Sequence, residues 1–381
     1  MEIMVVKVGV LFSQSGPMSM TEHAHIEGIL LACAEINAQA NERALQFEPV
    51  ILDPQGDDKR YAQLATELML EHKVSAIFGC CLSSSRKAVL PIIDRFNGIL
   101  LYPSVYEGFE YSPNVIYGGA IPNQVVLPLL EYIYRHLGKR VILVGSDTLY
   151  AREVNRIVKE FLGESEGIVI REVYFPFGTE SDQFLPLLNQ INENDVDAVI
   201  STVVGNDSVA LYESYGQSQL AGSEIPIASL TTTEAELSKV APKARAGHLS
   251  VSPYFSSLSN SENPAFVKAF HHRYGDSVLP SVYSETCYVQ MHMLANAILY
   301  CDDLSTESIL SGLSGSVFKS PSGDKYLDPV TNHFSHRPCI GKAQEDGRFD
   351  IVWKSQSVII PDPYLVTYSR TVTMKTESEL E

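Results

Sequence analysis

Basic residues are scarce in this sequence. Its 381 residues include 28 Lys and Arg against 46 Asp and Glu, which gives a formal net charge of −18. A chain this acidic repels nucleic acid and anionic lipid, so we expect no direct binding to DNA or RNA. The length exceeds that of one ordinary hydrophobic core and predicts two lobes.

The sequence also lacks the motifs of common catalytic and metal sites. GxSxG, GxxxxGK(S/T), GxGxxG and HExxH are missing, and none of the six cysteines forms a CxxC pair. His333 and His336 form an HxxH pattern without a carboxylate as third ligand, which favours a solvated loop over a metal site. His25 lies in a helical pattern and is expected at the surface. We therefore expect a protein that is not an enzyme and that holds no cofactor or metal.

Long apolar runs are missing too, and a membrane helix needs about 18 apolar residues. A secretory signal would place a basic segment and an apolar run ahead of the first strand. The chain instead begins a strand-like run at Val5. We expect no membrane insertion and a cytoplasmic protein. A periplasmic protein whose signal had been removed would look similar, so that alternative stays open.

Strand-like and helical patterns alternate along most of the chain. The first part has β-rich runs at 6–12, 47–52, 74–79 and 99–102, with helical patterns at 21–39, 59–71 and 84–96. The pattern restarts with helices at 124–136, 152–162, 182–191 and 208–215 and strands at 140–144, 168–174, 198–202 and 225–229. A strand at 249–254, helices at 264–274 and 283–300 and a β-rich tail at 334–355 follow.

This alternation predicts an α/β fold of two doubly wound lobes with parallel sheets. Ligands bind such sheets at the carboxyl ends of the strands, and a cleft between two lobes suits hinge closure.

Four loops that follow strands are rich in hydroxyl groups. Residues 79–87 contain three serines at a helix start, which either cap the helix or form a hydrogen-bonding cup. Residues 101–114 hold three tyrosines and a phenylalanine, either as ligand walls or as a hydrophobic plug. Residues 145–150 and 229–234 are the other two. An amino-acid ligand would also need a carboxylate facing its ammonium group, and Glu107, Asp147 and Glu234 lie in these loops.

Motifs over nearly the whole chain carry a family resemblance. They lie at 83–89, 102–114, 117–124, 145–147, 201–205, 229–232, 253–257 and 361–364, and the tyrosine-rich segment is the most specific. In these motifs the chain resembles the cytoplasmic amide sensors that negatively regulate bacterial aliphatic amidase operons. It resembles the urea- and short-amide-binding proteins of ABC importers more distantly.

The resemblance implies a type I periplasmic-binding-protein fold with three crossovers between lobes, near Pro122, Pro253 and Lys319. The first lobe would comprise residues 1–121 and 254–319, and the second 122–253 and 320–370. Residues 371–381 would form a flexible tail. The implied ligand-binding residues in the cleft are Cys81, Ser83, Tyr102, Ser104, Val105, Thr148, Tyr150 and Thr231.

Four of these positions depart from the family pattern. Ser104 stands in place of a threonine and keeps the hydroxyl, and Val105 stands in place of a proline. Cys81 and Thr148 both stand in place of tyrosines. Losing two aromatic walls predicts a larger pocket and a ligand larger or less amide-like than acetamide.

Three functions follow as hypotheses. The first is a receptor that binds a small uncharged amide and releases an RNA-binding antiterminator partner, with a homodimer also possible. The second is the solute-binding subunit of an ABC importer for urea, short amides or branched-chain amino acids. The third is an amide-hydrolysing enzyme with Ser83 or Cys81 as nucleophile, for which the sequence offers no evident base.

Overall fold

The apolar runs near the start of the chain form the strands of a parallel sheet. The computed structural model describes residues 4–39 and 45–366, and its first sheet has the strand order β2-β1-β3-β4-β5. Val8 and Val10 of β1 are completely buried, as expected for a parallel strand covered on both faces. The strands are β1 (Met4–Leu11), β2 (Leu45–Leu52), β3 (Ala76–Gly79), β4 (Leu100–Tyr102) and β5 (Val115–Tyr117).

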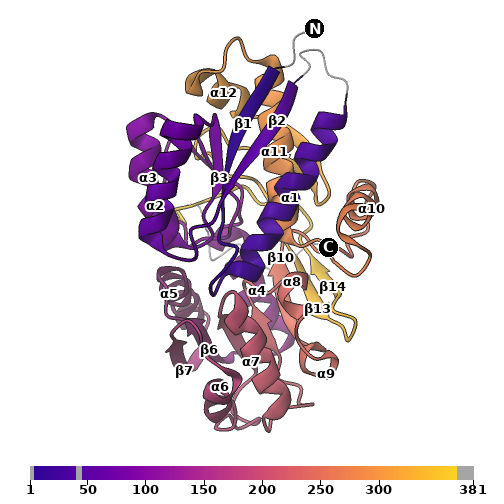
Figure 1. The fold of residues 1–381 in the computed structure, drawn as a ribbon. Coiled ribbons are helices and arrows are strands. Elements are labelled where there is room, and N and C mark those ends of the chain that lie inside the picture. Colours follow the sequence, from indigo (N-terminus) through magenta and orange to yellow (C-terminus); the bar gives the residue numbers. More distant parts are fainter. Residues whose placement is uncertain (1–3, 40–44, 367–381) are drawn as a thin grey trace, which may run out of the picture.

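Helices cover both faces of this sheet and complete the first lobe (Figure 1). One face packs against α1 (Ser19–Ala38), α11 (Val282–Tyr300) and α12 (Thr306–Leu313). The other packs against α2 (Asp58–Glu67), the π-helix η1 (Leu68–His72) and α3 (Ser83–Phe96). The first lobe also contains helix α10 (Asn263–Tyr274) and a hairpin of two short strands, β11 (Val317–Ser320) and β12 (Gly323–Tyr326).

The second lobe is built on a seven-stranded sheet of order β14-β13-β10-β9-β8-β6-β7. Its pairs are parallel except those of β13, which runs antiparallel to β10 and β14. The strands are β6 (Arg140–Ser146), β7 (Ile168–Phe175), β8 (Ala198–Thr202), β9 (Ile227–Ser229), β10 (Leu249–Ser252), β13 (Cys339–Ala343) and β14 (Phe349–Lys354). One face carries α4 (Pro122–His136) and α5 (Leu149–Glu164). The other carries α6 (Ser181–Leu188), α7 (Asn206–Gln217), α8 (Glu234–Leu237) and α9 (Pro242–Arg245).

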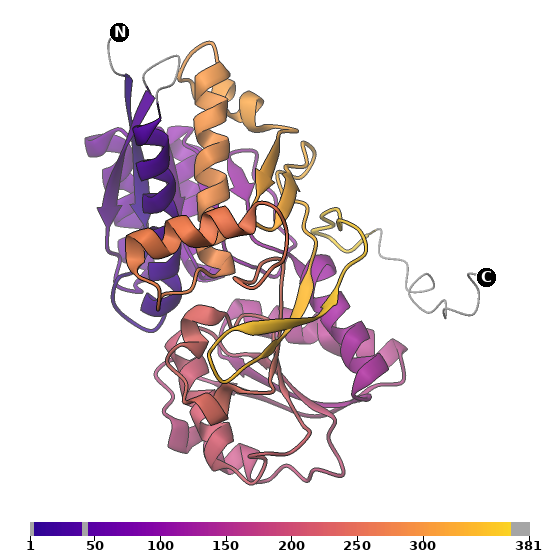
Figure 2. The ribbon, with the colours of Figure 1, turned by 90° about the vertical axis from the view of Figure 1, so that its right-hand side faces the viewer.

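The chain passes between the lobes in three places, and the last of them lies later than predicted. Figure 2 shows the late strands β13 and β14 joining the second lobe. Residues beyond Lys319 stay with the first lobe, because β11 pairs with β12 and His333 bridges Tyr117 of β5. The crossing therefore lies between His333 and the start of β13 at Cys339, not near Lys319. The predicted flexible tail, 371–381, lies outside the described residues.

The predicted α/β architecture of two parallel-sheet lobes is confirmed. Short elements were missed: β5, the β11–β12 hairpin, and helices α8, α9 and α12. Each of these strands and helices has eight residues or fewer, less than the window in which periodicity separates helix from strand. The predicted helix at 59–71 is α2 followed by the π-helix η1. Within the described residues, none of the helices has the length and apolar character needed to cross a membrane.

Candidate functional site

A small cavity lies between the two lobes, where loops from both sheets meet. Its volume is ≈ 20 Å³, enough for one water molecule. The first lobe contributes loops after β3 and β4 and the starts of α1 and α11. The second lobe contributes loops after β6, β8 and β9. The lining residues are Met18, Cys81, Leu82, Ser83, Ser104, Val105, Thr148, Tyr150, Val204, Thr231 and Tyr283.

All the predicted ligand-binding residues except Tyr102 line this cavity. Tyr102 is completely buried behind it, and its hydroxyl donates a hydrogen bond of 2.9 Å to the Cys81 carbonyl. The ring therefore supports the turn that carries Cys81 instead of forming a ligand wall. Whether the lining residues bind a ligand stays a prediction.

The pocket enlargement expected from Cys81 and Thr148 is not observed in this arrangement of the lobes. Tyr283 of α11, Met18 and Val204 also form the walls, and the remaining space is only ≈ 20 Å³. Tyr283 begins the helix predicted at 283–300. Its position at the first turn of a helix that points into the cleft becomes evident only from the fold.

Hydrogen bonds across the cleft hold the lobes together around the cavity. The Thr21 hydroxyl at the start of α1 donates to Glu236 Oε1 of α8 at 2.7 Å, and both side chains are buried. The Tyr283 hydroxyl donates to the Thr231 carbonyl at 3.2 Å. These contacts define a closed state, and a ligand larger than a water molecule needs an open state to enter.

The turn between β3 and α3 carries the serine that faces the cavity. Cys80 has a φ of 71°, a left-handed conformation that bends the chain sharply at the end of the strand. Of the two alternatives for these serines, the helix cap is not formed: Leu82 is the N-cap residue of α3, and Ser85 donates to the Leu82 carbonyl. Ser83 instead donates its hydroxyl hydrogen to Glu107 Oε2 at 2.5 Å.

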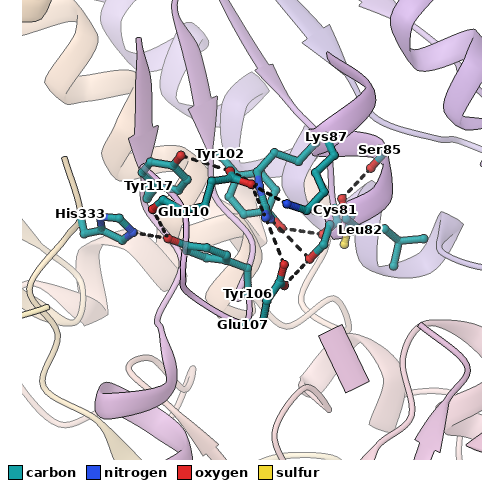
Figure 3. A network of polar contacts seen from close by, with 12 residues as sticks. Cys81, Leu82, Ser85, Lys87, Tyr102, Tyr106, Glu107, Glu110, Tyr117 and His333 are labelled. Atoms are coloured by element: carbon teal, nitrogen blue, oxygen red, sulfur yellow. Dashed lines mark hydrogen bonds and ion pairs between the residues drawn. The ribbon is translucent and has the colours of Figure 1, made fainter. Parts of the chain in front are cut away.

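Behind Ser83 lies a buried ionic network, which Figure 3 shows with Tyr106, Glu107, Glu110 and Lys87. Its centre is Arg86, a completely buried residue that donates to Glu110 Oε1 at 2.8 Å and to Glu107 Oε1 at 3.3 Å. Burial opposes ionisation of Glu110, but hydrogen bonds from Arg86 outweigh it and hold the pKa of Glu110 below its ordinary value.

Aromatic rings enclose the Arg86 guanidinium. Its central carbon lies 4.8 Å from the centre of the Tyr102 ring and 4.5 Å from that of Tyr106. His333 stacks on Tyr117 at 4.3 Å and hydrogen-bonds the Tyr106 hydroxyl. The prediction of a solvated HxxH loop was therefore wrong. His333 is completely buried, because its imidazole extends the stack of tyrosines.

His336, the other histidine of the HxxH pattern, is also buried, with 1% of its surface exposed. It faces the Lys325 ammonium nitrogen at 2.8 Å and the Gly118 carbonyl at 3.0 Å. His336 lies in the third crossing and Gly118 lies just before the first, so the contact links the two crossings. The spacing of the two histidines does not indicate this structural role.

Ser104 is oriented by His25, a buried histidine whose helical pattern predicts a surface position. His25 is completely buried, and burial lowers its pKa to about 3, so the ring is neutral. Its Nδ1 lies 2.9 Å from the Thr21 carbonyl and must carry the hydrogen, which leaves Nε2 as an acceptor. The Ser104 hydroxyl, 3.0 Å away, therefore donates to Nε2.

The second lobe contributes three hydroxyl groups. Thr231 donates to the Val203 carbonyl at 2.9 Å. Thr148 caps α5 by accepting from the Ala151 backbone N–H at 3.2 Å, which leaves its hydroxyl hydrogen free for another partner. The Tyr150 hydroxyl completes the set, and burial raises its pKa, so the phenol stays protonated.

A larger hollow of ≈ 590 Å³ lies along α10, lined by residues 256–276 of the first lobe. It is a wide groove open to solvent and has no contribution from the second lobe. Lobe closure cannot enclose a ligand there. The cavity between the lobes is therefore the better candidate for the site.

Comparisons with known proteins agree with this architecture. The isoleucine complex of the branched-chain amino-acid transporter substrate-binding protein LivJ from Streptococcus pneumoniae has a TM-score of 0.81 and 20% identity, over 94% of this chain and 100% of that one. A solute-binding protein from Rhodopseudomonas palustris with 3,4-dihydroxybenzoic acid has a TM-score of 0.82 and 18% identity, over 94% and 99%. At these identities the likeness shows the fold alone.

Two further matches come from sequence. A curated protein named limonene hydroxylase, from Geobacillus stearothermophilus, is 40% identical over 124 residues, which are 32% of this chain and 22% of that protein. This chain thus matches about a fifth of that protein's length. The family described as periplasmic binding protein domain matches residues 6–370. The chain therefore belongs to the periplasmic binding protein family.

Proposed function

We propose that this protein binds a small, uncharged, amide-like molecule in the cavity between its lobes. The observation that carries the proposal is the chemistry of the lining. Hydroxyl groups alternate with apolar and aromatic surfaces, and none of the lining side chains is charged. Neutral polar ligands suit such a site, because an ion buried there would lose its hydration without gaining a counterion.

The carboxylates that an amino-acid ligand would need lie elsewhere. Asp147 is half exposed and pairs with Arg152 at 2.7 Å. Glu234 is buried outside the lining and accepts from the Ser256 backbone N–H at 2.7 Å. Glu107 lies behind Ser83, where Arg86 balances its charge. An ammonium group in the cavity would thus lack a direct partner, which favours an amide or urea over the isoleucine held by LivJ.

For the biological role we propose first the solute-binding subunit of an ABC importer, which would act outside the cytoplasmic membrane. The fold of importer subunits that bind small molecules supports this choice. The second candidate is a cytoplasmic amide sensor that releases an RNA-binding antiterminator, and the motifs at 83–89 and 102–114 support it. Fractionation of the native cells separates the two: the importer subunit is expected outside the cytoplasm and the sensor inside it.

We propose no catalytic turnover. Burial raises the pKa of the Cys81 thiol well above its ordinary value, which leaves it protonated and a poor nucleophile. Ser83 does contact the Glu107 carboxylate, but that carboxylate is already paired with the Arg86 cation. Release of ammonia from propionamide at a rate that Ser83→Ala abolishes would overturn this part of the proposal.

The test is calorimetric titration with urea, a series from formamide to butyramide, leucine and benzoate. We expect saturable binding of an amide or urea. Thr148→Val should weaken it, because the substitution removes a free hydroxyl from the lining. Thr66→Val, whose hydroxyl donates to the Ala62 carbonyl inside α2, is the matched control and should bind like the wild type. Binding of leucine or benzoate alone would overturn the proposed ligand class.

A further inference from the structure

We infer that Glu107 sets the ligand specificity of the site by fixing which way the Ser83 hydroxyl points. In this arrangement Ser83 offers the cavity an oxygen lone pair instead of a hydrogen, so the N–H end of the ligand lies against it. The inference rests on the proposed function and goes beyond it, because it assigns an orientation to the ligand and a reason why carboxylates are rejected.

The hydrogen-bond polarity of Ser83 follows from its partners. A carboxylate can only accept, so the 2.5 Å contact with Glu107 Oε2 uses the single hydrogen of the hydroxyl. One of its two lone pairs faces Arg86 Nη1 at 3.4 Å. The other lone pair remains for a donor in the cavity, since Ser83 is among the lining residues.

Glu107 is held in place by the network behind it. Only 4% of its surface is exposed, and Arg86 donates to its Oε1 at 3.3 Å. Arg86 is itself fixed by Glu110 and by the two tyrosine rings that enclose the guanidinium. Glu107 therefore acts as a positioning residue, and Ser83 cannot turn its hydrogen into the cavity without leaving a buried carboxylate short of a donor.

Two more lining hydroxyls also donate their hydrogen away from the cavity. Ser104 donates to His25 and Thr231 donates to the Val203 carbonyl, so both present lone pairs to the cavity. Thr148 is the opposite case, because its oxygen accepts from the backbone and its hydrogen is free. An amide fits this division when its N–H groups face the three acceptors and its carbonyl faces Thr148.

A carboxylate of the same size has no hydrogen for these acceptors. Propionate would place a charged oxygen against the lone pairs that meet the N–H groups of propionamide. Repulsion and lost hydrogen bonds then act together, and the pair of molecules differs in little else. The ratio of their dissociation constants is thus a direct measure of the polarity that Glu107 imposes.

The experiment is titration of the full-length protein and its Glu107→Gln variant with propionamide and propionate. Glutamine keeps the shape but can donate to Ser83, which frees the hydroxyl to turn. We expect the wild type to bind propionamide about 100-fold more tightly than propionate, or more. In the Glu107→Gln variant the ratio of the two dissociation constants should be at least about tenfold smaller. Glu35→Gln is the matched control, since Glu35 also accepts from a hydroxyl, that of Tyr288 at 2.6 Å, away from the cavity.

The outcomes distinguish a failure of the role assigned to Glu107 from a failure of the proposed amide-binding function. An unchanged ratio in a folded Glu107→Gln protein overturns the inference alone, as does an equal loss in Glu35→Gln. A wild type that binds neither compound, or binds propionate as tightly as propionamide, overturns the proposed function as well. If Glu107→Gln does not fold, Ser83→Ala replaces it: the amide should then bind about tenfold more weakly with propionate unaffected. Equal weakening of both would contradict the inference.

Discussion

The hydrogen bond between Thr21 and Glu236 gives the most direct test of lobe closure. It joins α1 of the first lobe to α8 of the second at 2.7 Å, and less than 3% of either residue is exposed. Thr21→Val removes the hydroxyl and keeps the shape. In the open state water can hydrate Glu236, so the substitution acts on the closed state alone.

The size of the effect follows from the burial of the acceptor. Removing the donor leaves a buried oxygen of Glu236 short of a hydrogen-bond partner, which costs about 1–3 kcal/mol, and each 1.4 kcal/mol is about tenfold in an equilibrium constant. Because the ligand is enclosed only when the lobes close around it, its dissociation constant should rise by about 5- to 100-fold. Most of the change should appear as faster dissociation, since entry takes place through the open state.

Calorimetry gives the dissociation constant, and small-angle scattering with and without ligand reports whether the lobes close. Thr66→Val is the control again, because it is the same substitution at a hydroxyl that donates within one helix. A Thr21→Val protein that is folded and binds its ligand like the wild type would refute the idea that this contact holds the closed state.

Three further predictions concern stability. Arg86→Met removes the cation that faces the buried Glu107 and leaves Glu110 with Lys87 alone, so it should lower the unfolding free energy by about 3–5 kcal/mol in denaturant titration. Lys87→Met removes only a half-exposed partner of Glu110 and should cost under about 1 kcal/mol. Equal effects would contradict the ranking. Gly28→Ala would place a Cβ 2.1 Å from the Ser284 carbonyl oxygen, so the melting temperature should fall by several degrees, and an unchanged value would refute that contact. Burial raises the pKa of Glu22 from 4.5 to about 7, so the folded state keeps a proton that the unfolded chain releases. The resulting stability is present below pH 4.5 and lost as the pH rises to about 7. Glu22→Gln should flatten this part of the pH profile, and an unchanged slope would refute the assignment.

The architecture could be predicted because the signal lies in short stretches of sequence. The runs at β1 and β6 are mostly apolar, and the helices between strands are long enough to show a period. The elements that were missed have no such length. The third crossing was misplaced because the β11–β12 hairpin lies outside the large sheets, and the contact that keeps the following segment in the first lobe, Tyr117 with His333, joins residues far apart in sequence.

The cavity lining was largely predicted, but the groups that orient it were not. Ser83 and its partner Glu107 are 24 residues apart, and Ser104 and His25 are 79 apart. Thr21 and Glu236 are 215 apart. Composition and spacing hold no information about such pairs. A histidine in a helical pattern is ordinarily a surface residue, and only the packed fold turns His25 inward.

The division of roles between the lobes bears on how a ligand can drive closure. Two of the three acceptors, Ser83 and Ser104, belong to the first lobe, whereas Thr148 and its free hydrogen belong to the second. A ligand oriented as we propose meets its full set of partners only when both lobes surround it. A molecule that carries an N–H group without a carbonyl would meet Thr231 of the second lobe but would leave the Thr148 hydroxyl without a partner. Since a ligand shifts an equilibrium only by its differential affinity for the two states, such a molecule would drive closure less than an amide does.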